Sequence, residues 1–340
     1  MMKGARVLAG LAAALMLAAC EPPETPADPL PAPPAPEAPA IPEAERQAQL
    51  REARAERNRA ANRAAILASA QASDASQTQR DYYARMERTL LAQGRLRRDR
   101  DPSDASFDAE TLARNFVRIA LRDEYSRRDG ALLAEERAAP LRRWSAPVLF
   151  QPEFGASIDL GRQRAWRAEI ADYAARLSQA SGHPVRLAPQ DGNVVVLILS
   201  EDERRRIGPR LAELVPGIPP EDVSILTDLP PAIACTVFAY SVGASPVYAR
   251  AVAVIRAELP PLLRQSCIHE ELAQAMGLAN DSPAARPSIF NDDEEFALLT
   301  RHDELLLRML YDPRLRPGMT EAEALPILRR IAAELLAQPA

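Results

Sequence analysis

Apolar residues recur along the chain with regular spacing, and this spacing predicts where its helices lie. Apolar positions three or four residues apart are typical of a helix that buries one face. The first such set is Leu112, Phe116, Ile119, Ala120 and Tyr125, and the second is Trp166, Ile170, Tyr173, Ala174 and Leu177. The second helix is predicted to end at Ser181-Gly182. The segment 259–277 is also predicted to be helical.

Short apolar runs predict strands at 147–151, 185–187, 194–199, 234–240 and 251–255. The third of these runs is apolar throughout, which predicts a central strand that is buried on both faces. The segment between the third and fourth runs, from Pro209 to Pro231, is rich in proline and glycine and is predicted to be a loop. Strands that alternate with helices indicate an α/β or α+β domain. We expect an α+β fold that begins near Phe107.

The first twenty residues have the order of a secretory signal. Basic residues precede an apolar run over 7–18, and a small residue precedes Cys20. The run is too short to remain in a bilayer as a spanning helix. The residues Leu17-Ala18-Ala19-Cys20 resemble the lipobox of bacterial lipoproteins, which implies cleavage before Cys20 and acylation of this cysteine. The alternative is an ordinary signal peptide in which the cysteine stands by chance.

Two segments of unusual composition separate this leader from the compact domain. Ten of the 22 residues from Glu21 to Pro42 are proline, which predicts a semi-rigid linker without helix or sheet. The segment 44–100 is rich in Ala, Arg, Glu and Gln and has no proline, so a long solvated helix or stalk is predicted, with a possible break near 69–76. A coiled-coil dimer is the alternative, but the apolar residues do not sustain heptads.

Charge and cysteine content narrow the choice of compartment and partner. The formal net charge is -5 and the pI is about 5.5, which argues against a nucleic-acid partner. Once lipid occupies Cys20, Cys235 and Cys267 are the remaining cysteines, and in an oxidising compartment they are predicted to form a disulfide. Two buried free thiols are the alternative.

The helix predicted after the last strand carries the most informative residues. In zinc peptidases of the metzincin class, two histidines four residues apart bind the metal, a glutamate beside the first activates water, a glycine ends the helix and a third ligand follows. The chain resembles this pattern when Gly277 is aligned with the glycine. Glu270, Gln274 and Asn280 then occupy the three ligand positions, and Glu271 occupies the position of the catalytic glutamate.

The resemblance to metzincins continues on both sides of this helix. Residues 288–290 stand where metzincins have a methionine turn, with a phenylalanine in place of the methionine. Thr300 and Asp303 open a segment that is similar to the closing helix of metzincins, and they have the spacing of a helix cap. Upstream, the segment 141–147 is similar to the opening of such domains. The resemblance therefore covers roughly 107–319.

The amino-acid sequences of three segments show a second, more specific resemblance. Residues 270–281, 288–292 and 306–315 resemble a family of bacterial lipoproteins, the domain of unknown function 2927 family. The two resemblances imply a metzincin-like mixed sheet packed on an active-site helix and a C-terminal helix, preceded by the linker and the stalk. The expected domains are a signal peptide at 1–19, a lipid anchor and linker at 20–43, a partly disordered stalk at 44–106, a metzincin-like domain at 107–319 and a C-terminal helix at 320–340.

The changed ligands weaken the case for catalysis. Spacing excludes a three-histidine site on one helix, because the histidines of the chain are His183, His269 and His302. Glu270 can bind a cation, but the amide oxygens of Gln274 and Asn280 are poor zinc ligands. We therefore expect no cofactor, or a weakly bound divalent cation, and Glu271 is catalytic only if the site is active. The acidic stretch 291–295 lacks the spacing of an EF-hand loop and predicts no site.

Two main functions fit this pattern. The favoured one is a lipoprotein of the cell envelope that binds or scaffolds, using a degenerate protease cleft to hold a peptide or an envelope protein. The alternative is an active metal-dependent hydrolase or peptidase with atypical ligands, and a structural spacer between membrane and cell wall is a third possibility. The expected partners are a membrane, through the lipid anchor, and a peptide or envelope protein. Glu21 after the cysteine implies the periplasmic face of the outer membrane.

Overall fold

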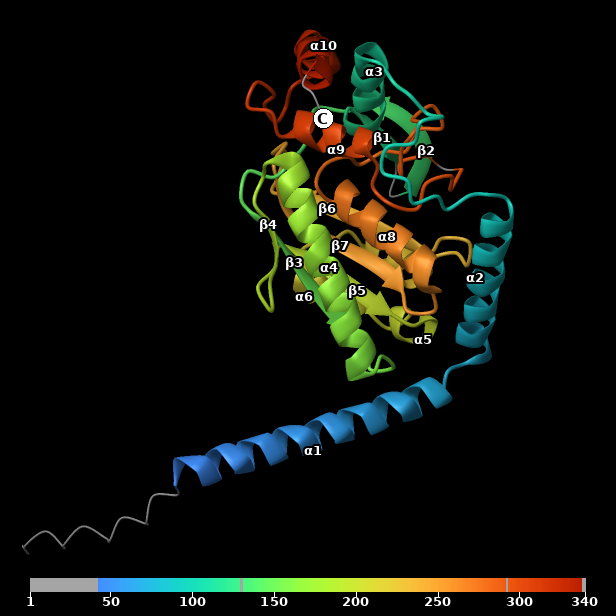
Figure 1. Ribbon diagram of the computed structural model, residues 1–340, viewed down its shortest axis with the longest axis vertical. Helices are drawn as coiled ribbons and strands as arrows, with labels where there is room; N and C mark the ends of the chain where they lie inside the picture. The colour runs from blue at the N-terminus through green and yellow to red at the C-terminus, as the bar shows by residue number, and fades with distance from the viewer. Residues whose placement is uncertain (1–41, 129–130, 292, 338–340) are drawn as a thin grey trace, which may run out of the picture. The chain divides into compact units, whose positions relative to one another are not determined.

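The computed structural model describes residues 42–128, 131–291 and 293–337. The predicted signal peptide, the predicted lipidation site Cys20 and nearly all of the predicted proline-rich linker lie outside these residues. The described chain is a mixed α+β protein, as its sequence patterns predict (Figure 1). None of the described helices is long and apolar enough to cross a bilayer.

A five-stranded mixed sheet forms the centre of the fold, in the order β4, β3, β5, β7, β6. The neighbours from β4 to β7 are parallel, and β6 pairs antiparallel with β7 at one edge. β5 is buried at every residue, as the continuous apolar run predicts. The bounds are β3 Val148–Phe154, β4 Val185–Leu187, β5 Val194–Leu199, β6 Cys235–Ser241 and β7 Tyr248–Arg256.

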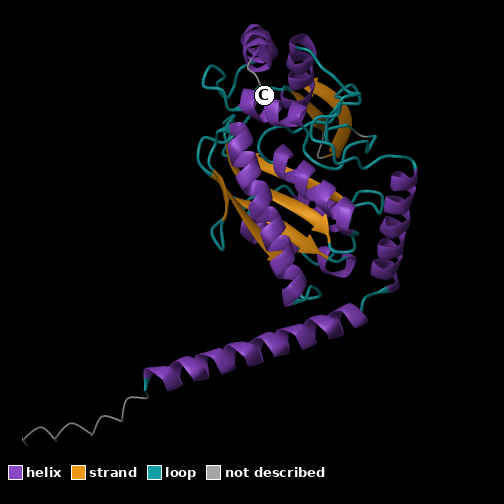
Figure 2. Cartoon of the chain, in the orientation of Figure 1, coloured by secondary structure: helices purple, strands orange, loops and turns teal. Residues whose placement is uncertain are grey.

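Alternate side chains of β5 enter two different cores, because successive residues of a strand point to opposite faces. One set packs in the larger core with α4 (Leu160–Ser181) and α8 (Pro261–Gln274). Both helices cross the sheet in Figure 2. The other set packs in a smaller core with α6 (Gly208–Leu214) and α7 (Pro220–Thr227). The sheet is therefore covered on both faces.

Helices α6 and α7 correct the prediction of a loop between Pro209 and Pro231. A proline stands in the first turn of each helix, where its missing N–H would have no intrahelical acceptor. Leu211, Leu214 and Leu226 are buried in the smaller core. The prolines thus begin two short helices that tertiary packing stabilises, although the same residues are also typical of loops.

A hairpin after the first helix of the domain is a second correction. α3 spans Ala109–Ala120, and it is followed by antiparallel strands β1 (Arg122–Arg128) and β2 (Ala131–Ala138). Tyr125, which the helical spacing assigned to the first helix, belongs to β1. The helical spacing fails before Tyr125, because the positions three and four residues after Ile119 and four residues after Ala120 are the charged residues 122, 123 and 124.

The segment predicted as a stalk forms two helices, and the second is part of the compact body. α1 spans Glu43–Ala70 and α2 spans Asp74–Ala92, with the break inside the range that the sequence indicates. On α2, Tyr83 and Leu90 are buried in the larger core. α2 also packs against α8 and against α5 (Glu201–Arg204).

Two helices form the C-terminal part of the described chain. The first lies at the end of the region that resembles metzincins, and the second follows this region. α9 spans Arg301–Leu310 and α10 spans Glu321–Ala337. The predicted cap of α9 is confirmed: the Thr300 hydroxyl accepts from the Asp303 N–H, and the Asp303 carboxylate accepts from the Thr300 N–H at 2.9 Å. α10 packs against α3 and α9.

Candidate functional site

A groove of about 1060 Å³ lies between strand β6 and helix α8. Every residue of β6 lines it, and α8 contributes Glu270, Glu271 and Gln274. Asp281, in the turn after α8, lines it as well. The groove therefore gathers three of the four residues of the metzincin-like pattern, Glu270, Glu271 and Gln274, together with Asp281, which that pattern does not include.

Strand β6 offers one backbone edge to this groove. β6 ends the sheet, so its hydrogen-bonded neighbour in the described sheet is β7 alone. The N–H of Arg256 donates to the carbonyl of Ala234 at 3.3 Å, so this carbonyl faces β7. Backbone direction alternates along an antiparallel strand. Cys235, Val237 and Ala239 therefore direct their N–H and C=O groups to the edge that β7 leaves open.

The two walls of the groove are joined by the cysteine pair that the sequence predicts. Cys235 on β6 and Cys267 on α8 form a disulfide, with their Cα atoms 5.9 Å apart. The crosslink closes a loop with a sequence separation of 32 residues. A loop of this length corresponds to about 3–4 kcal/mol of stabilisation by restriction of the unfolded chain. The disulfide fixes the distance between the edge strand and the helix that carries Glu270 and Glu271.

The groove side of α8 carries acidic and amide groups at different depths. The Glu271 side chain is deeply buried, with the residue 4% exposed, whereas Glu270 and Gln274 are half-buried. The amide nitrogen of Gln274 donates to the carboxylate of Asp281 at 3.0 Å. This contact ties the end of α8 to the turn that follows, and it uses the Gln274 amide as a hydrogen-bond donor.

Gly277 makes the sharp turn that ends this helix region. Its φ is +122°, and a Cβ atom at this position would lie 2.5 Å from the carbonyl oxygen of Arg142. Glycine is required on both counts, because a side chain would be strained and would clash with backbone. The indole N–H of Trp144 donates to the Ala275 carbonyl at 2.7 Å, so the segment around Trp144 packs directly on this turn.

The three candidate ligand positions do not converge. The Asn280 side chain is 3% exposed, and its amide nitrogen donates to the Arg118 carbonyl at 2.8 Å at the end of α3. Asn280 does not line the groove that Glu270 and Gln274 share. Within the described residues, no group of three or more His, Cys, Asp or Glu side chains is placed to hold a metal ion. The donor set at these three positions therefore does not fit a catalytic zinc ion.

His269, the residue that precedes Glu270 on α8, has a structural role in the protein. Its Nδ1 accepts from the Leu299 N–H at 3.0 Å, and its ring stacks on Tyr173 with centroids 4.0 Å apart. Burial, with a smaller contribution from the charge of Arg176, lowers the pKa of His269 to about 3. The imidazole is neutral at physiological pH and connects α8 to α4 and to the residues before α9.

The turn at 288–290 is a buried connection to α9. The Ser288 hydroxyl donates to the Asp303 carboxylate at 2.6 Å, and the same carboxylate accepts from the Ile289 N–H at 3.2 Å. Phe290 is fully buried in the larger core. Asp303 therefore caps its own helix and also holds this turn against the start of α9.

The acidic stretch 291–295 contributes ion pairs at its end. Glu295 is paired with Arg97 at 3.0 Å and with Arg286 at 2.7 Å. These guanidinium groups, Arg286 first and then Arg97, lower the pKa of the Glu295 carboxyl against the effect of burial. Asn291 donates its amide to the Ala285 carbonyl at 3.0 Å. Residue 292 of this stretch lies outside the described residues.

Sequence reasoning missed Asp281 and the edge of β6. Asp281 stands one position beyond the third ligand position of the metzincin pattern, so the pattern pointed to Asn280. Asp281 is acidic and directly follows Asn280, so it could have been considered as a groove residue, but the metzincin spacing does not point to it. The edge of β6 is a property of strand order, which no residue of the strand encodes locally.

Comparison with known proteins gives a family but no relative of established function. Neither a curated protein nor a solved structure is found to match the chain. A family model described as "Protein of unknown function (DUF2927)" matches residues 109–330, which is more than half of the chain and includes every residue of the groove on β6 and α8. The chain belongs to this DUF2927 family of proteins of unknown function.

Proposed function

We propose that the protein is a lipid-anchored component of the cell envelope whose groove binds an extended peptide segment without cleaving it. The observation that carries the proposal is the open backbone edge of β6, which runs along a groove large enough for a peptide. Proteins recognise extended peptides in this way by adding them as a further strand to a sheet edge.

The geometry of β6 supports binding by strand addition. Three backbone N–H and C=O pairs, at Cys235, Val237 and Ala239, face the open edge. An extended peptide that pairs with this edge would gain main-chain hydrogen bonds there, and its alternate side chains would contact α8 on one side. The disulfide between β6 and α8 keeps the width of the groove constant, so less ordering of the protein is needed on binding.

We also propose that the frame is metzincin-like and that the chemistry of that class has been lost. A helix after the last parallel strand, a glycine turn at Gly277 and the buried turn at 288–290 support the frame. The engagement of Asn280 with the Arg118 carbonyl and the neutral amide of Gln274 argue against a bound catalytic zinc. Binding of a peptide then remains as the function of the groove.

The anchor belongs to the same proposal. The lipobox-like residues before Cys20 and the proline-rich composition of the segment after it support attachment to a membrane by lipid. Such an anchor would keep the groove on the periplasmic side of the outer membrane, where extended segments of envelope proteins are accessible.

The test uses a phage-displayed library of random linear peptides and the purified, oxidised protein. We expect enriched peptides to bind and to slow amide hydrogen exchange at Cys235, Val237 and Ala239. Val237→Pro removes one outward N–H from the edge strand, where proline is tolerated, and should weaken binding of an enriched peptide by about tenfold. Val237→Ala keeps the N–H and serves as the matched control.

Either of two results would contradict strand addition. One is the absence of any enriched peptide that competes for the groove. The other is equal binding of an enriched peptide by the Val237→Pro and Val237→Ala proteins, both shown to be folded, since this would mean that the backbone edge of β6 is not used.

A further inference from the structure

A second cavity, which shares no lining residue with the groove, lies at the carboxyl ends of the parallel strands. Its volume is about 620 Å³. Ser157 follows β3, Ser200 follows β5 and Glu258 follows β7, and all three line it. In Figure 1 the arrowheads of β5 and β7 point toward this region, beside α5. The crevice at the carboxyl ends of parallel strands is where open α/β sheets generally bind ligands.

Two of the three carboxylates that line this cavity are fully used by the protein. Asp202 accepts from the N–H of Ser73 at 2.9 Å and from the Ser73 hydroxyl at 2.5 Å, one bond to each oxygen. Glu203 accepts from the Ser157 N–H at 2.7 Å with one oxygen and from the Ser200 N–H at 2.8 Å with the other. These bonds make a rigid polar floor and leave little capacity for a ligand on either group.

Glu258 is different. It is 4% exposed, and its Oε1 accepts from the Ser76 hydroxyl at 2.5 Å and from the Glu201 N–H at 2.8 Å. Among the described residues, its Oε2 has no hydrogen-bond donor, although it is buried. A buried carboxylate oxygen without a donor is costly, so a donor supplied by a ligand would be bound favourably.

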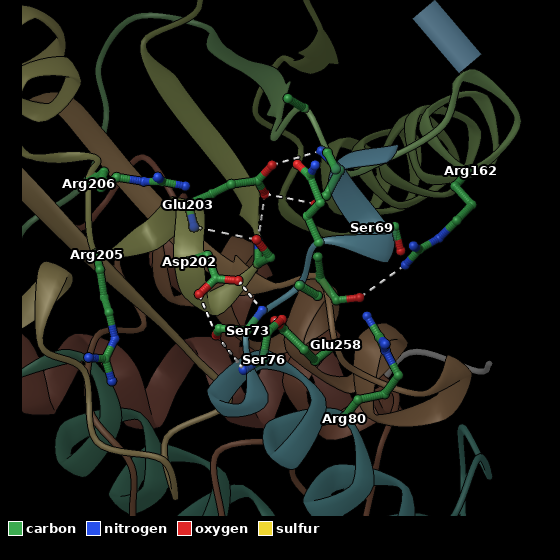
Figure 3. A pocket seen from close by; sticks show the side chains of 17 residues that line it. Ser69, Ser73, Ser76, Arg80, Arg162, Asp202, Glu203, Arg205, Arg206 and Glu258 are labelled. Carbon is green, nitrogen blue, oxygen red and sulfur yellow. Dashed lines mark hydrogen bonds between the residues drawn. The ribbon is translucent and has the colours of Figure 1, made fainter. Parts of the chain in front are cut away.

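Two arginines flank this carboxylate from different helices. Arg162, on α4, donates to the carbonyl of Ala257, the neighbour of Glu258, at 3.0 Å. Arg80 lies one turn after Ser76 on α2, and Figure 3 shows its side chain and that of Arg162 pointing toward one another. Within the described chain, neither guanidinium forms an ion pair with a carboxylate. Burial lowers the pKa of Arg162, and the charge of Arg80 lowers it further, against the opposing charge of Asp159.

We propose that this cavity binds a small zwitterion, a free amino acid or a short peptide, with its ammonium group at Glu258 Oε2 and its carboxylate between Arg80 and Arg162. The ammonium group supplies the donor that Oε2 lacks, and the carboxylate neutralises the two adjacent guanidinium groups. A simple anion would satisfy the arginines alone and would be repelled by Glu258. The volume lies within the range of small-molecule sites and leaves room for a side chain.

The experiment uses the purified full-length protein and a panel of the twenty amino acids and of glycyl dipeptides. We expect at least one member of the panel to bind in isothermal titration calorimetry and to raise the melting temperature. N-acetylation or C-amidation of that ligand should each weaken binding by at least about tenfold, because each removes one of its two charges.

Variants locate the site independently of the ligand chemistry. Glu258→Gln keeps the acceptor for Ser76 and Glu201 but replaces the ligand-facing charge, and Arg80→Gln removes one guanidinium from an exposed position of α2. Each should weaken binding of the same ligand by at least about tenfold. Arg88→Gln, two turns further along α2 and outside the cavity, is the matched control.

Three outcomes would overturn the proposal. The first is the absence of binding by any zwitterion of the panel to the folded protein. The second is binding of inorganic phosphate or acetate as tight as that of the best zwitterion, which would indicate a simple anion site. The third is a pair of results: Arg80→Gln binds the ligand as tightly as wild type does, and wild type binds the N-acetylated ligand as tightly as the unmodified one. The derivative ligands test the wild-type protein, so the result does not depend on the folding of Glu258→Gln.

Discussion

The carboxylate of Glu87 on α2 accepts hydrogen bonds from the backbone N–H groups of Leu262 and Leu263, both at 2.9 Å, in the first turn of α8. The residue before this helix is Pro260, whose side chain provides no cap. A helix that precedes the region matched by the family model therefore caps the helix that carries the groove residues. The negative charge also lies at the positive end of the α8 dipole.

Loss of this cap should destabilise the protein. Glu87→Ala should lower the free energy of unfolding by about 1 kcal/mol, because two N–H groups of α8 lose their acceptor. Urea unfolding followed by circular dichroism measures the change. Arg88→Ala, at the exposed neighbouring position, is the control and should leave stability nearly unchanged. Equal stability of the two variants would show that α2 does not support α8 through this contact.

The cysteine pair should be oxidised in the folded protein. Thiol labelling of the unreduced, unfolded protein should modify neither Cys235 nor Cys267, and reduction should make both reactive. Replacement of both cysteines by alanine should lower the free energy of unfolding by about 3 kcal/mol, since the crosslink closes a loop with a separation of 32 residues. Quantitative labelling of both thiols before reduction would contradict the disulfide.

Glu201 should make the free energy of unfolding depend on pH in the acidic range. It lies between Arg204 and Arg256, and all three side chains are at most 4% exposed. Burial alone would raise the pKa of Glu201, but hydrogen bonds from Arg204 and Arg205 and the charges nearby outweigh it and lower the pKa to about 2. Arg256 also donates to the carbonyl of Ile233, in the loop that leads into β6. The ion pair therefore helps to position the groove strand.

Because the folded pKa of Glu201 is below its ordinary value of 4.5, its stabilisation is fully present above pH 4.5 and is lost as the pH falls toward about 2. Glu201→Gln should lower stability by about 3 kcal/mol at neutral pH, because two buried guanidinium groups lose their counterion. The difference from wild type should narrow between pH 4.5 and 2. Glu213→Gln, at an exposed ion pair, should change little at any pH. A difference that does not vary with pH would refute this role of the carboxylate.

The groove should not contain a catalytic zinc ion. Elemental analysis of protein purified without chelator should find no stoichiometric zinc, and the protein should not cleave casein. Glu271→Gln, which keeps the shape of the side chain, should change the free energy of unfolding by about 1 kcal/mol or less. One equivalent of zinc, with casein cleavage that Glu271→Gln abolishes, would make the protein an enzyme, since removal of a general base costs about 100-fold or more.

Lipidation should depend on Cys20. Globomycin, which inhibits the lipoprotein signal peptidase, should make the unprocessed precursor accumulate. The Cys20→Ser protein should leave the membrane fraction, because serine at this position cannot carry the proposed acyl chain on a cysteine thiol. Membrane fractionation by immunoblot measures this, with wild type as the control. A Cys20→Ser protein that stays with the membrane would disprove the lipid anchor.

The local sequence alone determined those elements that depend on interactions between residues close together in the chain. The apolar run of β5, the helical spacing of α4 with its end at Gly182, and the cap of α9 by Thr300 and Asp303 all follow from interactions within a few residues. Gly277 belongs to the same group, because its left-handed backbone conformation is typical of glycine. These parts of the fold could be predicted because propensity, spacing and tertiary structure agree.

The tertiary structure alone decided which residues face the groove. Asn280 and Asp281 are adjacent and both polar, yet contact with the Arg118 carbonyl turns the first inward and leaves the second in the groove. The open edge of β6 arises from strand order, and the cap of α8 comes from Glu87, far away in the sequence. Likewise, the prolines at 209 and 220 begin helices because the smaller core buries the leucines that follow. Contacts between distant segments decide these features, and their energies are not encoded in any local pattern of the chain.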